Sequence, residues 1–69
     1  MIDTMALKGI IVSRGETQKS VAHKIGVSEG AFYNKMKRGV FDSDDMYAMV
    51  KLLDIENPGR IFFAEEVAQ

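Results

Sequence analysis

Residues 18–37 read QKSVAHKIGVSEGAFYNKMK and contain two short helix patterns, one after the other. Val21 and Ile25 lie four residues apart in the first pattern, and Phe32 and Met36 do so in the second. A spacing of four places each pair on one face of a helix. The stretch therefore predicts two amphipathic helices in immediate succession.

The turn between these two patterns is short. Gly26 suits the left-handed backbone conformation that ends a helix without steric cost, and Ser28 is a favoured N-cap type. A second helix can therefore begin within three residues of the end of the first. Helices joined in this way must cross steeply, and Ala22 is small enough to let them approach closely. The stretch predicts a helix-turn-helix unit, whose second helix can lie in the major groove of DNA.

A further helix is expected before this unit. It covers Thr4 to Arg14, with Leu7, Ile10 and Ile11 on one apolar stripe, and Gly15 ends it. The helix-turn-helix unit is thus preceded by an amphipathic helix.

Polar residues and glycine mark the boundaries of the next helices. Thr17 caps the second helix, Gly39 ends the third, and Asp42 caps the fourth. The core-facing stripe of the fourth helix consists of Met46, Met49, Val50 and Leu53.

The last segment runs from Pro58 to about Val67. Proline suits a first helical turn, which predicts a short helix carrying Ile61 and Phe62. A strand through Arg60–Ala64 is the alternative, because the sequence Ile-Phe-Phe also has high β propensity.

The length and composition fit one small domain. With 69 residues, the chain is expected to form a single, compact, all-α domain of five helices over residues 1–69. It has no cysteine, which excludes disulfides and thiolate metal sites. Its longest apolar runs, Ile10–Val12 and Ile61–Ala64, are too short for a membrane span or a secretory signal. A soluble, cytoplasmic protein is therefore expected.

The charge is divided unevenly along the chain. The net charge is −1, but residues 1–40 carry seven Lys and Arg against three Asp and Glu, whereas residues 41–69 carry two against seven. The first part, at +4, can face phosphates while the second, at −5, points away from them. Ordinary scatter of charge in a small chain is the alternative interpretation.

The chain resembles the small phage-repressor and Cro-like helix-turn-helix regulators, which have the lambda-repressor-like DNA-binding fold. The residues that match the family are Thr17, Gln18, Val21, Ala22, Ile25–Ser28, Phe32 and Lys37–Gly39. Those that match a subgroup of short phage or prophage regulators are Phe41, Asp42, Leu52–Ile55 and Pro58–Phe63. The resemblance covers about Leu7 to Ala64, and it implies a regulator in the cytoplasm of a bacterial host.

One position departs from the family pattern. Members usually place a branched apolar residue three after Phe32, where this chain has Lys35. Met36, one residue later, can fill the same part of the core.

The third helix offers candidates for reading DNA bases. With Phe32 pointing inward, its outward ridge consists of Gly30, Tyr33, Asn34 and Lys37. Asn34 can pair bidentately with adenine, and Glu29 can accept a hydrogen bond from the cytosine amino group. The helix N-terminus meets base edges in this docking mode. We therefore expect base contacts from Ser28, Glu29, Gly30, Tyr33 and Asn34.

Phosphate contacts are expected at two other places. Gln18 and Lys19 begin the second helix, where free N–H groups and the positive end of the dipole suit an anion. Lys35, Lys37 and Arg38 lie at the far end of the third helix, and the resemblance implies backbone contacts at the same two regions.

Several of these residues also have a purely structural interpretation. Glu29 in a first helical turn, and Lys37 and Arg38 in a last one, stabilise the helix dipole with or without DNA. Asn34 can be an ordinary solvated surface residue.

The expected function is sequence-specific binding of double-stranded DNA by a transcriptional regulator. The resemblance implies a homodimer on an inverted-repeat operator, and apolar Phe62, Phe63 and Val67 near the end of the chain are candidates for its dimer surface. A protein-interaction module on the same fold, such as an antirepressor partner or an antitoxin component, is the alternative. One histidine and the absence of a Gly-rich phosphate loop or metal-ligand spacing argue against an enzyme, a metal site, a cofactor or a small-molecule substrate.

Overall fold

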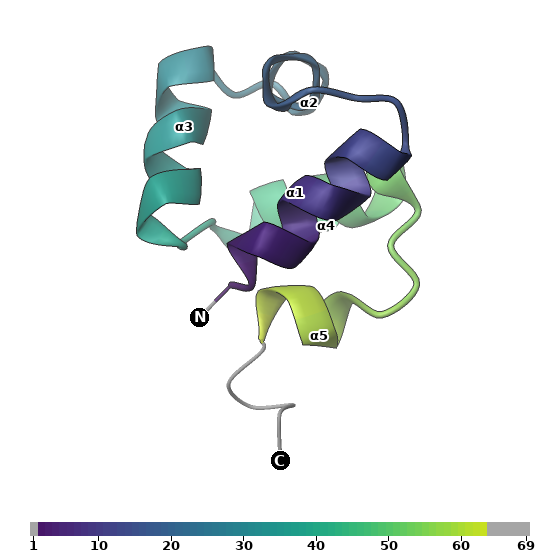
Figure 1. Cartoon of the computed structure of the whole chain (residues 1–69). Helices are drawn as coiled ribbons and strands as arrows, with labels where there is room; N and C mark the ends of the chain where they lie inside the picture. The colour runs from purple at the N-terminus through teal and green to yellow at the C-terminus, as the bar shows by residue number, and fades with distance from the viewer. Residues whose placement is uncertain (1, 64–69) are drawn as a thin grey trace.

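Five helices surround one apolar core in the computed structural model, which describes residues 2–63 (Figure 1). They are α1 (Thr4–Ser13), α2 (Gln18–Ile25), α3 (Glu29–Arg38), α4 (Ser43–Leu53) and α5 (Pro58–Phe62). The predicted all-α class and the five helices are thus confirmed. Residues 60–62 are helical, so the strand alternative is wrong there. The helix predicted to run to about Val67 ends instead at Phe62, because Phe63 has left the helical conformation (φ −132°, ψ 47°); residues 64–67 lie outside the described part of the chain.

Side-chain caps set where the middle three helices begin, as the sequence predicted. The Thr17 hydroxyl accepts a hydrogen bond from the backbone N–H of Ser20 at 3.0 Å, and the Ser20 hydroxyl accepts one from the N–H of Thr17 at 2.9 Å. The side chains of Ser28 and Asp42 each accept a bond from the backbone N–H three residues later. These bonds satisfy N–H groups that a helix start leaves without a partner.

The junction between α2 and α3 is the three-residue turn expected from Gly26. This glycine has φ +79°, and the backbone N–H of Val27 donates to the carbonyl of Ala22 at 2.9 Å. Ala22 is buried, and α2 and α3 pack closely. Figure 1 looks down the axis of α2 while α3 runs along one side, so the two helices cross steeply.

The first helix ends one residue earlier than predicted, and Arg14 takes up a different role. Arg14 Nε donates to the backbone carbonyl of Leu53 at 2.7 Å, and Nη2 donates to that of Asp54 at 3.2 Å. The guanidinium thereby satisfies carbonyls at the C-terminus of α4, where the helix dipole favours a cation. This contact joins parts of the chain about 40 residues apart.

The core combines side chains from all five helices and from the segments between them. Its buried members are Ile2, Leu7, Ile11, Val21, Ala22, Phe32, Met36, Phe41, Met49, Leu53, Ile55, Ile61 and Phe62. The rings of Phe32 and Phe41 meet at a centroid distance of 5.3 Å. The Asp3 N–H donates to the Ile61 carbonyl at 2.8 Å, which ties the start of α1 to α5. Most of the predicted stripe positions are confirmed, whereas Ile10, Ile25, Met46 and Val50 are only partly buried and pack at the edge of the core.

The burial of Phe62 corrects one expectation. Its side chain is 4% exposed and belongs to the core, so it is not available to a dimer surface. Its neighbour Phe63 is 49% exposed, and Val67 lies outside the described residues. Within residues 2–63, none of the helices has both the length and the apolar character that a membrane crossing requires.

Candidate nucleic-acid interface

The outer side of α3 is exposed to solvent. Phe32 and Met36 anchor the helix in the core, with exposures of 0% and 4%. The residues of the predicted ridge, Gly30, Tyr33, Asn34 and Lys37, are all exposed. Tyr33 keeps 51% of its surface in water despite its size. The helix therefore presents one side to the core and a continuous polar and aromatic side to solvent.

The start of α3 combines a cap with an exposed carboxylate. The Ser28 hydroxyl oxygen accepts a hydrogen bond from the Ala31 N–H at 3.2 Å, so Ser28 has a structural role as well as an exposed position. Glu29 is exposed in the first turn, where the helix dipole stabilises an anion. Its position suits both the structural interpretation and contact with a base.

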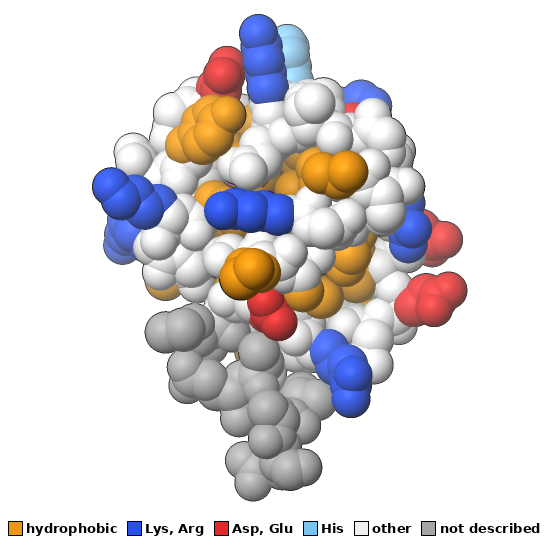
Figure 2. Space-filling model, viewed as in Figure 1, with side chains coloured by type: hydrophobic (Ala, Val, Ile, Leu, Met, Phe, Trp, Pro, Cys, Tyr) orange, Lys and Arg blue, Asp and Glu red, His pale blue; other side chains and the backbone are white. Residues whose placement is uncertain are grey.

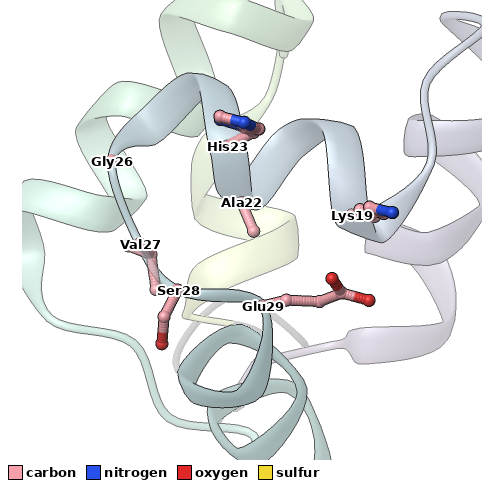
Figure 3. Close-up of a pocket in the computed structure, with 7 residues that line it drawn as sticks. All are labelled: Lys19, Ala22, His23, Gly26, Val27, Ser28 and Glu29. Carbon is pink, nitrogen blue, oxygen red and sulfur yellow. The ribbon is translucent and has the colours of Figure 1, made fainter.

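Glu29 also lines a hollow of about 460 Å³ between α2 and α3. Lys19, Ala22 and His23 of α2 and the turn from Gly26 to Ser28 form the rest of its wall (Figure 3). In Figure 3 the Glu29 side chain extends from α3 toward the end of α2 that carries Lys19. His23 is exposed. The hollow therefore carries groups of both charge signs next to the N-terminus of α3.

Gly30 leaves space on the exposed side of α3. A Cβ built at this position meets no heavy atom within 4 Å. The protein itself therefore gives no steric reason for a glycine there. A glycine in a helix interior costs about 1 kcal/mol relative to alanine, so packing within the fold does not explain its presence.

The structure separates Lys35 from the other predicted phosphate contacts. Lys35 Nζ donates a hydrogen bond to the Asp45 carboxylate and lies 3.6 Å from the Asp42 carboxylate. The hydrogen bond to Asp45 raises the pKa of Lys35 above its ordinary value. Because two carboxylates at the start of α4 already hold this ammonium, we leave Lys35 out of the interface. Lys37 and Arg38 are exposed in the last turn of α3.

At the start of α2, Lys19 is exposed and Gln18 is only partly so. The Gln18 Oε1 atom is buried and has no hydrogen-bond partner. Since buried polar atoms are nearly always paired, this oxygen is an exception among the described side chains. The first turn of α2 contains no acidic side chain.

Glu16, just before α2, is neutralised locally. Glu16 accepts hydrogen bonds from Ser20 Oγ at 2.6 Å and from Lys24 Nζ at 2.7 Å. The bond from Lys24 holds the pKa of Glu16 below its ordinary value, so the carboxylate stays charged and paired at neutral pH. Because Lys24 is paired with Glu16, Lys19 is the cation available at the start of α2.

Lys8 is an exposed cation that the site prediction from the sequence did not include. Leu7 and Ile11 point inward from α1, so the helical period places Lys8 on the outer side. Lys8 and Tyr33 line the same hollow, although they come from different helices. The sequence pattern predicts that Lys8 points outward from α1, but it does not predict that Tyr33 of α3 lines the same hollow.

Comparisons with protein-family models, with curated proteins and with solved structures found no match for this chain.

Proposed function

We propose that this chain is a sequence-specific, double-stranded-DNA-binding transcriptional regulator of the phage repressor and Cro-like type, with α2 and α3 as its helix-turn-helix. The observation that carries the proposal is the exposure of Tyr33 and Asn34 on a helix anchored by Phe32 and Met36. A rigid helix with a free outer side is the element that enters a major groove.

The distribution of charge supports the same proposal. The part of the chain up to residue 40, which contains α1, α2 and α3, has a net charge of +4, and the remainder carries −5. Lys19 flanks the start of α2, and Lys37 and Arg38 lie at the end of α3. These cations can contact phosphates on either side of the groove, which fixes the position of the protein without reading the sequence.

In the proposed mechanism, a homodimer occupies an inverted-repeat operator and blocks RNA polymerase. The two copies of α3 must lie about 34 Å apart to enter successive turns of the major groove. Exposed Val40 and Phe63 border a hollow of about 280 Å³ at the end of α3, together with buried Phe41 and Phe62. Val40 and Phe63, which are exposed, therefore replace the buried Phe62 in the proposed contact between copies.

A protein-interaction module is the second candidate. It is favoured by the exposed carboxylate of Glu29 at the end of α3 that would read bases, and by the overall acidity, with a pI of about 5.7. Both repel phosphate. An antirepressor partner or an antitoxin component on this fold would bind a protein instead of DNA.

A gel-shift experiment distinguishes the two candidates. The protein is mixed with genomic DNA fragments at low and moderate salt, beside Lys37→Glu and a control, Lys51→Glu, which makes the same charge change at an exposed site on α4. Retarded bands that disappear for Lys37→Glu and persist for Lys51→Glu support the regulator. Absence of retarded bands with the unmodified protein contradicts it and favours the interaction module.

A further inference from the structure

A further hollow, of about 410 Å³, lies where α1, the start of α2 and the middle of α3 meet. The residues in its wall that bear on binding are Lys8, Val12, Glu16, Gln18, Lys19 and Tyr33. It differs from the hollow at Glu29, because α1 forms part of its wall. Figure 2, which views the molecule with α1 in front, shows a Lys or Arg side chain near the middle of this face with hydrophobic side chains around it.

The hollow is positively charged. Lys8 and Lys19 are both exposed, and neither forms an ion pair with a carboxylate among residues 2–63. Glu16 is the acidic side chain of the wall, and both of its oxygens accept hydrogen bonds, one from Ser20 and one from Lys24. Since Lys24 balances that carboxylate, two lysine charges remain to attract an anion.

The uncharged part of the wall suits the sugar–phosphate backbone rather than a free ion. Val12 is 73% exposed, which leaves apolar surface in water beside the two lysines. Tyr33 adds the face of a ring and a hydroxyl that can donate to a phosphate oxygen. Gln18 adds a side-chain amide whose N–H groups can donate to a phosphate oxygen. A nucleic-acid backbone, in which anionic phosphates alternate with apolar sugar carbons, matches this combination.

We infer that this hollow holds one DNA backbone phosphate and its sugar, with Lys8 of α1 acting together with Lys19 and Tyr33. The inference rests on the proposed function and adds α1 to the DNA-binding surface. It also places Tyr33 between the base contacts and the backbone contacts. This side chain belongs both to the outer ridge of α3 and to the wall of the hollow.

The test compares Lys8→Gln with Lys51→Gln, which removes the same charge from the exposed surface of α4. Binding to a duplex selected from random sequences, and to a scrambled duplex, is measured by fluorescence anisotropy over a range of salt concentrations. A phosphate contact adds about 0.9 to the slope of log K against log salt. The ratio of the unmodified protein's affinity to that of Lys8→Gln should therefore fall about threefold when the salt concentration is raised about fourfold. The loss should be equal on both duplexes, because phosphate contacts carry no sequence information.

A second variant tests the apolar part of the hollow. Val12→Ser should weaken binding without changing the salt slope, because a sugar contact releases no counterion. Circular dichroism checks that the variants remain folded, as expected for exposed positions.

The inference fails if Lys8→Gln has the salt slope of the unmodified protein, or if Lys51→Gln lowers the slope equally; in both cases the proposed function stands. Failure of the unmodified protein to bind any duplex overturns the proposed function and this inference together.

Discussion

The ammonium of Lys35 in α3 donates a hydrogen bond to the carboxylate of Asp45 in the first turn of α4. Asp45 is the buried charged residue of the described core, at 9% exposure, and Lys35 is partly covered. A carboxylate in such a position needs a charged partner, because desolvation without one is costly. The ion pair fixes the second half of the proposed recognition helix to the helix that follows it.

This pairing predicts opposite behaviour for two lysines of the same helix. Lys35→Met should lower the melting temperature, because Asp45 loses its partner, but it should leave the salt slope of DNA binding unchanged. Lys37→Met should lower the slope by about 0.9 and leave the melting temperature almost unchanged. Thermal unfolding and salt titration of both variants check this. A reduced slope for Lys35→Met would return Lys35 to the phosphate contacts.

The acid stability of the fold should depend on Asp42. The hydrogen bond from the Asp45 backbone N–H, and then the nearby Lys35 ammonium, hold the pKa of Asp42 below its ordinary value. The charged form therefore stabilises the folded state above the ordinary pKa, about 4, and this stabilisation is lost as the pH falls through the lower folded value.

Asp42→Asn isolates that contribution, because asparagine is also a good N-cap but has no charge. We expect the unmodified protein to have the higher melting temperature at neutral pH, and the difference to close in acid. Glu16, whose pKa is also lowered, is common to both proteins and does not affect the comparison. A difference that is constant across the pH range would contradict this assignment.

Two glycines should respond to alanine in opposite ways. Gly26 has φ +79°, so Gly26→Ala should destabilise the fold by roughly 1–2 kcal/mol through backbone strain alone, since its Cβ would meet nothing. Gly30 is the second residue of α3, where alanine should stabilise the fold by up to about 1 kcal/mol, the value for a helix interior. Denaturant unfolding measures both effects.

Gly30→Ala should nevertheless weaken DNA binding, because the added methyl group lies on the side of α3 proposed to approach the bases. A variant that is both more stable and equally tight in binding would show that close approach at Gly30 is not required.

Asn34→Ala should remove base preference at one position of each half-site. A bidentate contact with adenine contributes about 1–3 kcal/mol of discrimination, so selected and substituted duplexes should become nearly equal in affinity. Asn57→Ala is the matched control, because Asn57 is exposed and makes no side-chain cap bond at the start of α5. Competition binding with single-base variants of the selected duplex provides the measurement.

The proposed dimer surface can be tested at Val40, which is 57% exposed at the border of its hollow. Val40→Asp should leave the monomer folded. It should reduce affinity for a two-half-site operator by about 10²-fold or more, because the bound first copy no longer helps to hold the second copy on the neighbouring half-site. Tyr47→Asp, at a similarly exposed apolar position on α4, is the control. Sedimentation of the protein–DNA complex counts the bound copies, and two copies of Val40→Asp at unchanged affinity would refute this surface.

Much of the fold could be predicted because its signals are local. Thr17, Ser28 and Asp42 cap their helices through bonds to residues three positions away, and Gly26 and Gly39 end helices through their own backbone conformation. Apolar residues at helical spacing then gave the inward side of α3, and hence the exposure of Tyr33 and Asn34. None of these inferences needs a contact between distant segments.

The sequence by itself thus determined where α2, α3 and α4 begin, where α2 and α3 end, and which side of α3 faces outward, since all of these depend on groups within one or two helical turns. Only the tertiary structure decided that Lys35 is held by Asp45, that Arg14 satisfies the last carbonyls of α4, that Phe62 is buried and that Lys8 shares a hollow with Tyr33. The reason is geometric: each of these outcomes depends on which helix packs beside another, and the period of one helix carries no information about its neighbour.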